Sequence, residues 1–254
     1  MSEKRNFKQS FKRSAIISAV TTFIAYMIIS RVDWELFGFE SGGGPKPAAA
    51  VEKAARTAAV AETVTIDGRT WMTKNLNVWT GSSWCYENSP DSCDKYGRLY
   101  TWRAANRACA SLGDGWRLPT VYDWDALVNT MGGNKIAAPQ LRSQIGWSSI
   151  ERGDTIMIPV CTDDFGFSAL PGGKRYCKDY YRSRSSRTQY LFGGIGYYGV
   201  WWTATTTPGD GGKAYQMGIG LAEKIISEFY SELSSPYKTE GYSVRCVQNK
   251  ERRK

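Results

Sequence analysis

Residues 96–128 constrain the fold more than any other stretch, because they carry the pattern of two helices separated by a proline-containing connector. In the first half, apolar residues recur at helical spacing until Gly113 ends the run. The connector at residues 115–119 is predicted to be extended, because the residue before a proline is kept out of the helical region. Thr120 then stands where a helix cap belongs, with Asp123 three residues later as a variant of the capping box. We therefore expect two short amphipathic helices, whose apolar faces need a β-sheet from the rest of the domain.

Strands are expected on both sides of this helical pair. Residues 63–66 and 69–72 alternate around Asp67-Gly68, which is a strong hairpin signal. Residues 200–205 and 214–221 are predicted to be strands on either side of a glycine-rich turn. Residues 242–248 form a closing strand that should pair near the first hairpin and bring the two ends of the domain together. The side chains expected to face the core at the start of the domain are Val64, Ile66, Trp71 and Leu76.

The chain begins with a short basic segment, residues 1–13, followed by 17 uncharged residues at positions 14–30. As a helix, the second segment would be about 25 Å long, slightly short of a hydrocarbon core of about 30 Å. Because the basic residues precede the span, we expect a cytoplasmic N-terminus and export of the remainder. A cleaved signal peptide is the alternative, but no small-residue cleavage site stands at the right place, which favours a retained signal-anchor.

The remaining organisation follows from composition. Residues 31–61 are rich in Gly, Pro and Ala, which is typical of a linker that either spaces the domain from the membrane or acts as a disordered tether. Residues 62–248 form the folded domain, and residues 249–254 are a second basic tail. We expect a membrane-anchored protein whose domain lies in the periplasm or on the bacterial cell surface.

The net charge of +9 is concentrated in the two tails. Residues 1–13 carry a net +4 and residues 250–254 a net +3, which leaves +2 for the rest of the chain. Charge in the tails indicates membrane topology and solvation, so we expect no nucleic-acid partner.

Histidine is absent from the chain, which excludes several kinds of site. No Ser-His or Cys-His pair can form, and zinc would lack its usual nitrogen ligand. The adjacent acids Asp163 and Asp164 are weak support for calcium, which takes six to eight oxygen ligands. No motif indicates the paired carboxylates of glycoside hydrolysis, whose separation is in any case a three-dimensional property. We expect no enzymatic activity, no metal and no cofactor.

A series of short motifs runs in order along residues 62–248. They are Ile66-Asp67-Gly68-Arg69-Thr70-Trp71-Met72, Asn75-Leu76-Asn77, Trp84-Cys85-Tyr86, Tyr96-Gly97-Arg98-Leu99-Tyr100-Thr101-Trp102, Gly115-Trp116-Arg117-Leu118-Pro119-Thr120, Phe167-Ser168-Ala169-Leu170-Pro171-Gly172-Gly173, Gly199-Val200-Trp201-Trp202-Thr203 and Gly241-Tyr242-Ser243-Val244-Arg245-Cys246-Val247. Together they resemble the Fibrobacter succinogenes major paralogous domain, a family of bacterial surface or secreted modules without a settled activity.

The resemblance also implies a fold. The Trp-Arg-Leu-Pro-Thr pattern is similar to that of the C-type-lectin-like and formylglycine-generating-enzyme folds. We therefore expect an α+β, C-type-lectin-like domain with two short helices packed on irregular antiparallel sheets, preceded by one N-terminal transmembrane helix. The acid–amide pair and the Trp-Asn-Asp motif of calcium-dependent lectins are missing, so a calcium-dependent mechanism is not supported.

The six cysteines favour disulfide bonds, because an even number beyond a membrane segment is typical of an oxidising compartment. Six cysteines allow fifteen pairings. The preferred set is Cys85–Cys93, Cys109–Cys246 and Cys161–Cys177, and free buried thiols are the alternative. Formylglycine-generating enzymes depend on a cysteine pair late in the domain, whereas Cys246 has no neighbouring partner.

The best candidate for a binding site is the segment 174–198, where arginines and lysines alternate with tyrosines. Tyrosine rings offer flat apolar faces and arginines offer forks for carboxylate, sulfate or phosphate. The outward-facing residue of the Trp201-Trp202 pair is expected to border the same surface. The candidate ligand-binding residues are Arg175, Tyr176, Tyr180, Tyr181, Arg182, Arg184, Arg187, Tyr190, Tyr197, Tyr198 and Trp202. A solvated loop with structural tyrosines is the alternative interpretation.

Three functional hypotheses follow. The first is an extracytoplasmic binding or adhesion module that recognises a glycan, a cell-wall polymer or a protein through these aromatic and basic loops. The second is a structural or assembly component of a bacterial envelope or surface complex. The third and weakest is an enzyme of the sulfatase-modifying kind, which free redox-active thiols would support.

Overall fold

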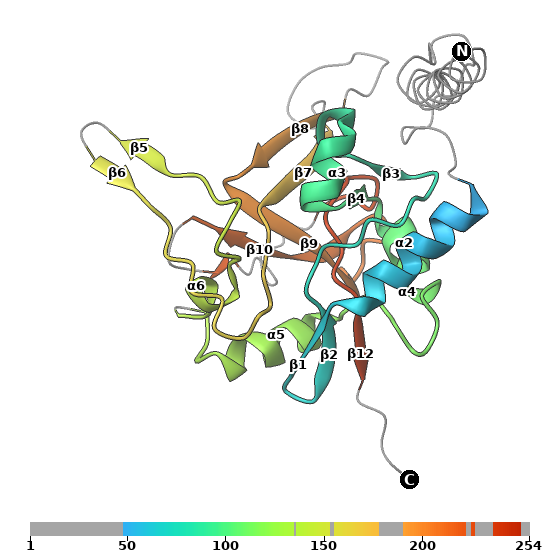
Figure 1. The fold of residues 1–254 in the computed structure, drawn as a ribbon, viewed down its shortest axis with the longest axis horizontal. Coiled ribbons are helices and arrows are strands. Elements are labelled where there is room, and N and C mark those ends of the chain that lie inside the picture. Colours follow the sequence, from blue (N-terminus) through green and yellow to red (C-terminus); the bar gives the residue numbers. More distant parts are fainter. Residues whose placement is uncertain are drawn as a thin grey trace, which may run out of the picture. The chain divides into compact units, whose positions relative to one another are not determined.

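The structure, a computed structural model, describes residues 48–134, 136–152, 155–177, 190–221, 225–226 and 236–249 (Figure 1). The predicted anchor at 14–30, the basic tail at 1–13 and most of the linker at 31–61 lie outside these ranges. Among the helices within them, none is both long and apolar enough to cross a bilayer. The predicted transmembrane helix therefore stays a prediction.

The described part has an α+β architecture of short helices and sheets, as expected (Figure 1). The helices are α2 (Ala49–Ala61), α3 (Pro90–Tyr96), α4 (Trp102–Ala110), α5 (Val121–Thr130), α6 (Ala137–Leu141) and the 3-10 helix η2 (Tyr86–Asn88). The strands are β1 (Thr63–Ile66), β2 (Arg69–Met72), β3 (Ser83–Trp84), β4 (Leu99–Tyr100), β5 (Ile150–Arg152), β6 (Thr155–Met157), β7 (Gly172–Cys177), β8 (Tyr190–Ile195), β9 (Tyr198–Thr206), β10 (Ala214–Gly220), β11 (Ile225–Ile226) and β12 (Val247–Asn249).

The helical pair predicted from residues 96–128 is confirmed as α4 and α5. The side chain of Thr101 caps α4 by accepting a hydrogen bond from the Ala104 amide. Thr120 and Asp123 form the expected capping box at the start of α5, each side chain accepting from the other residue's backbone amide. In the connector between the helices, Gly115 lies in a turn with a φ angle of 77°, and Arg117 then pairs with Val247 of the last strand.

The predicted closure of the domain is also confirmed. Strands β1 and β2 form a hairpin whose turn residues Asp67 and Gly68 have φ angles of 49° and 67°, as a two-residue turn of this type requires. Strand β12 pairs with β2, so the sheet order β1-β2-β12 places the first and last strands of the domain in one sheet.

A five-stranded sheet in the order β11-β10-β9-β7-β8 carries the core on both of its faces. It is mixed rather than wholly antiparallel, because β7 and β9 pair in parallel at Gly173 and Gly199. One apolar cluster contains Trp201 and residues of α5 and α6, and the other contains Trp202 and residues of α4.

The prediction that Trp202 borders a binding surface was therefore wrong. The side chains of Trp201 and Trp202 do point to opposite faces of β9, but both are fully buried because helices cover both faces. The Trp202 indole N–H donates to the Tyr100 carbonyl, and its ring lies 4.5 Å from that of Tyr242. Trp202 is a core residue.

The buried side chain of Asn75 forms hydrogen bonds with residues from several of the family-like motifs, and we call this network the buried polar node. The side-chain oxygen of Asn75 accepts hydrogen bonds from Trp201 Nε1 at 2.9 Å and from Arg245 Nε at 2.8 Å. Its amide nitrogen donates to the Tyr96 carbonyl at 2.8 Å. The guanidinium of Arg245 also donates to backbone carbonyls, including that of Phe167. Burial lowers the pKa of Arg245 to about 9, so the side chain is charged at neutral pH.

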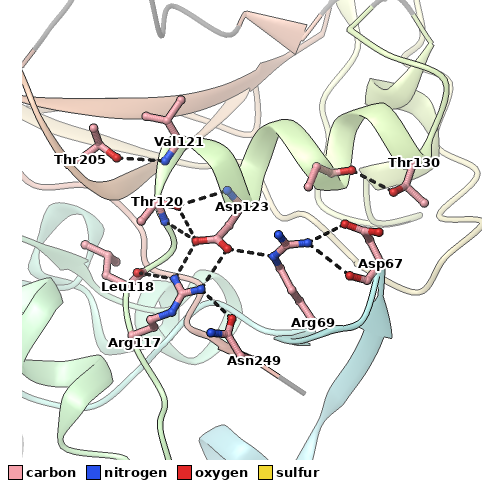
Figure 2. Close-up of polar contacts among 11 residues, drawn as sticks. Asp67, Arg69, Arg117, Leu118, Thr120, Val121, Asp123, Thr130, Thr205 and Asn249 are labelled. Carbon is pink, nitrogen blue, oxygen red and sulfur yellow. Dashed lines mark hydrogen bonds and ion pairs between the residues drawn. The ribbon is translucent and has the colours of Figure 1, made fainter. Parts of the chain in front are cut away.

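A second polar cluster fastens α5 to the first hairpin (Figure 2). The Asp123 carboxylate accepts from Arg117 Nη1 at 2.6 Å and Nη2 at 3.0 Å, from Arg69 Nε at 2.9 Å, and from the Thr120 amide and hydroxyl, both at 2.7 Å. Burial alone would raise the pKa of Asp123, but the hydrogen bonds from Arg117 and Thr120 hold it well below its usual range. Because these donors occupy the carboxylate, we interpret Asp123 as structural.

Candidate functional site

The structure describes six of the eleven predicted ligand-binding residues. Tyr180, Tyr181, Arg182, Arg184 and Arg187 lie outside the described residues. The six that it places are Arg175 and Tyr176 on β7, Tyr190 on β8, Tyr197 in the turn that follows, and Tyr198 and Trp202 on β9. Apart from the buried Trp202, these residues gather on and around the β7–β8 hairpin.

The register of this hairpin divides the candidate residues between its two faces. Arg175 lies opposite Phe192, and Cys177 lies opposite Tyr190. Directly opposed residues share a face and neighbours in sequence alternate, so Arg175 and Tyr190 project from one face of the hairpin. Tyr176 projects from the other. The described candidate residues of the segment 174–198 are therefore divided between the two faces of the hairpin.

On the first face, the guanidinium of Arg175 is held between two aromatic rings. Its Cζ atom lies 3.8 Å from the centroid of the Trp84 ring and 3.7 Å from that of the Tyr190 ring. Two rings at such stacking distances cannot occupy the same face of one guanidinium, so they cover its two opposite faces. We refer to Trp84, Arg175 and Tyr190 as the aromatic clamp.

The Trp84 side of the clamp is fixed by a short disulfide loop. Trp84 pairs with Leu99 in the β3–β4 sheet and is 8% exposed. The next residue along the chain is bonded in the Cys85–Cys93 disulfide. Arg98 contacts this loop: its Nε donates to the Ser83 hydroxyl at 2.9 Å, and its Nη1 contacts both sulfur atoms of the disulfide.

The Arg175 side of the clamp is fixed by backbone pairing with Gly241. Each of the two residues donates its amide to the other's carbonyl at 2.8 Å. A Cβ atom at position 241 would lie 2.9 Å from Arg175 Cβ, so only glycine lets the strand and the loop approach this closely.

The clamp leaves the charge of Arg175 without an acceptor in the described part of the chain. Burial lowers the pKa of the guanidinium, and the neighbouring Tyr190 and Cys177 act in the opposite direction. An arginine keeps its proton at neutral pH even so. Within the described ranges, no carboxylate or carbonyl receives a hydrogen bond from its side chain, so none of these residues satisfies the N–H groups at its edge.

The opposite face of the hairpin carries a smaller cation–tyrosine group. Lys174 Nζ lies 5.5 Å from the Tyr176 ring centroid and 5.8 Å from that of Tyr198. Burial, with smaller contributions from Tyr176 and Tyr86, raises the pKa of Tyr198 to about 12, so this hydroxyl is a neutral hydrogen-bonding group. A Cβ atom at Gly194 would lie 2.0 Å from the Tyr198 ring, which explains the glycine there.

Tyr197 is the most exposed of the placed candidates, with 48% of its surface accessible.

Trp84 was not among the predicted binding residues, because the sequence indicated only a disulfide-closed surface loop around it. Trp84 belongs to the aromatic clamp through its contact with Arg175, which lies 91 positions later in the chain, and no local sequence pattern indicates such a contact.

Two of the three predicted disulfides are confirmed, Cys85–Cys93 and Cys109–Cys246. The third was wrong, because the structure leaves Cys161 and Cys177 as free thiols. Cys161 lies in the loop that packs on α6, where its neighbour Thr162 donates to the Pro139 carbonyl, whereas Cys177 ends β7. The two cysteines thus belong to different elements. Burial raises the pKa of the Cys161 thiol, which disfavours the reactive thiolate.

A cavity of about 460 Å³ lies beside the β5–β6 hairpin. Its wall includes Trp147, Ile156, Ile158 and Cys161. Among the described residues, no charged side chain and none of the predicted ligand-binding residues lines it.

The comparisons with known proteins give one match. The family model of the Fibrobacter succinogenes major domain matches residues 64–248, which confirms the resemblance seen in the ordered motifs. Neither the search of curated proteins nor that of solved structures found a match. Because the family model covers most of the chain, this protein belongs to the Fibrobacter succinogenes major domain family.

Proposed function

We propose that this chain is a membrane-anchored, extracytoplasmic binding module that recognises a glycan or cell-wall polymer at the β7–β8 hairpin. The observation that carries the proposal is the aromatic clamp. Aromatic rings offer flat apolar faces to ligands, and an arginine fork recognises acidic groups. An arginine with a purely structural role is expected to donate to acceptors within the protein, as Arg245 does.

The location is proposed from the sequence and the disulfides. The uncharged residues 14–30 follow a basic segment, which favours an anchor with a cytoplasmic N-terminus. The Cys85–Cys93 and Cys109–Cys246 bonds fit an oxidising compartment on the far side of the membrane. After alkaline extraction, the full chain should stay with the membranes. Its release into the soluble fraction would contradict the anchor.

We also propose that the α+β domain has the C-type-lectin-like arrangement. The features that support this are the pairing of the first and last parts of the domain in the β1-β2-β12 sheet and the two helices α4 and α5 against a central sheet. The Cys109–Cys246 bond, which joins α4 to the C-terminal segment, is in keeping with it.

The test of function is a polysaccharide array probed with the full chain at two salt concentrations. Tyr190→Ala removes one wall of the clamp and should weaken binding of the recognised polymer about tenfold. Tyr122→Ala is the matched control, because Tyr122 is 79% exposed on α5 and lies outside the clamp. A folded chain that binds no polymer would contradict the proposal and redirect the search to a protein partner.

The arginines predicted from the sequence need a test of their own. Changing Arg182, Arg184 and Arg187 together to alanine should reduce binding and its salt sensitivity if they contribute to the same ligand contact. Unchanged binding in this variant would limit the site to the clamp.

The alternative function is a structural or assembly component of a bacterial envelope or surface complex. The observation that favours it is a group of exposed apolar side chains near the β5–β6 hairpin: Ile145, Ile156, Ile158 and Val160 are 71%, 60%, 77% and 55% exposed. Apolar surface of this kind is typical of protein interaction sites. Changing Ile156 and Ile158 to serine should then abolish co-purification of envelope proteins and leave polymer binding intact.

A catalytic role of the sulfatase-modifying kind has less support. It would need a reactive cysteine pair late in the domain. Cys246 is bonded to Cys109, and the free thiols of Cys161 and Cys177 belong to different elements. We therefore propose a non-enzymatic function.

A further inference from the structure

We infer that the edge of the Arg175 guanidinium is a carboxylate-binding fork, so that the recognised polymer is one that carries carboxylate groups, such as a polyuronate. This inference rests on the proposed binding function and specifies its ligand class.

Arg175 differs from three other shielded arginines in the hydrogen bonds of its guanidinium group. Arg245 and Arg142 are almost fully buried, and both direct their guanidinium groups at backbone carbonyls. Arg117 directs its group at the Asp123 carboxylate. Withdrawing a charged donor from water is costly unless its hydrogen bonds are replaced. In the described ranges Arg175 alone of these four has only ring contacts, so its hydrogen bonds are left for a ligand or for solvent.

The two rings of the clamp restrict the direction from which a ligand can approach Arg175. Trp84 and Tyr190 lie against the two faces of the guanidinium and Arg175 is only partly buried, so a ligand would approach along the edge in the guanidinium plane. A carboxylate is planar and pairs with this edge through two parallel N–H···O bonds. Sulfate and phosphate are tetrahedral and would carry oxygen atoms out of that plane toward the apolar rings. The slot between the rings therefore favours carboxylate.

Two parts of the clamp are held in place before a ligand binds. The Cys85–Cys93 loop and the β3–β4 pairing fix Trp84, and the reciprocal bonds to Gly241 fix the backbone of Arg175. A site whose parts are already in place loses less entropy on binding. The partly exposed ring of Tyr190 also offers an apolar wall to the C–H groups of a sugar that bears the carboxylate.

The experiment measures binding of the full chain to polygalacturonate by calorimetry. Carboxyl-reduced polygalacturonate and dextran sulfate are run beside it. Arg175→Lys keeps the charge and removes the fork, and should weaken polygalacturonate binding about tenfold. The matched control is Arg103→Lys, because Arg103 is an exposed residue of α4, and this variant should bind as the wild type does. The carboxyl-reduced polymer should not bind.

The outcomes separate the two proposals. Polygalacturonate binding that Arg175→Lys leaves unchanged would overturn the fork and leave the binding module standing. Preference for dextran sulfate would overturn the carboxylate assignment. Absence of binding to every polymer, with a folded chain, would remove both.

A measurement on the wild type alone covers the case in which Arg175→Lys fails to fold. Trigalacturonate should compete with the polymer, whereas its carboxyl-reduced form should not. Equal competition by the two trisaccharides would refute the fork.

Discussion

Replacing Asn75 by alanine tests whether the buried polar node holds the domain together. The substitution removes the partner of two fully buried donors, Trp201 Nε1 and Arg245 Nε, and the donor to the Tyr96 carbonyl. Each buried group left without a partner costs about 1–3 kcal/mol. Two buried donors and one part-buried carbonyl give a loss of about 4 kcal/mol, a large part of the roughly 5–15 kcal/mol by which domains are stable.

The assay is urea unfolding followed by tryptophan fluorescence and circular dichroism. With a slope of about 2 kcal/mol/M, the midpoint should fall by about 2 M. Asn77→Ala is the control from the same Asn-Leu-Asn motif, because Asn77 is exposed and its loss should change stability by less than about 0.5 kcal/mol. Asn75→Asp should fall between the two, since a carboxylate still accepts from both donors. An Asn75→Ala protein within about 1 kcal/mol of the wild type would show that the domain does not depend on the Asn75 hydrogen bonds.

Two further predictions concern the other fastenings of the domain. Because the pKa of Asp123 is depressed in the folded state, its contribution to stability is present above the unfolded value of about 3.9 and is lost as the pH falls below it. Asp123→Asn should therefore cost about 2–3 kcal/mol at pH 7 and lose less on acidification than the wild type, as measured by urea midpoints between pH 7 and about 2.5. The disulfides span 137 and 8 residues, so loop-closure entropy predicts a cost of about 5 kcal/mol for replacing Cys109 and Cys246 by alanine, and about 2.5 kcal/mol for Cys85 and Cys93. Urea unfolding of both double variants measures whether loss of the longer bridge lowers stability more. Only loss of the Cys85–Cys93 bond should also weaken polymer binding.

The parts of the fold that were predictable from the sequence depend on local physical chemistry. The Asp67-Gly68 turn requires positive φ angles at two adjacent residues, and few sequences other than Asn-Gly or Asp-Gly supply them. The cap formed by Thr120 and Asp123 lies within four residues of chain. In both cases the interacting groups are neighbours in sequence, so the pattern itself contains the contact.

The predictions that were wrong depended on distant parts of the chain. Alternation along β9 places Trp201 and Trp202 on opposite faces, but it does not report that α4 and its neighbours cover the second face. The clamp itself combines Arg175, which was predicted, with Trp84, which was not, because their contact forms only when β3 and β7 meet. The preferred pairing of Cys161 with Cys177 was wrong because the structure leaves both cysteines free, in separate elements.

The most direct test of the clamp as a binding site is a nuclear magnetic resonance titration of the full chain in detergent micelles with trigalacturonate. The arginine Nε–Hε signals are followed, and that of Arg175 is assigned by its absence from the Arg175→Lys spectrum. If Arg175 binds the ligand, its signal and the Trp84 indole signal should both show a saturable shift. Arg245 should not shift, because protein acceptors already hold its donors. Saturable shifts at other arginines with Arg175 unmoved would contradict the account.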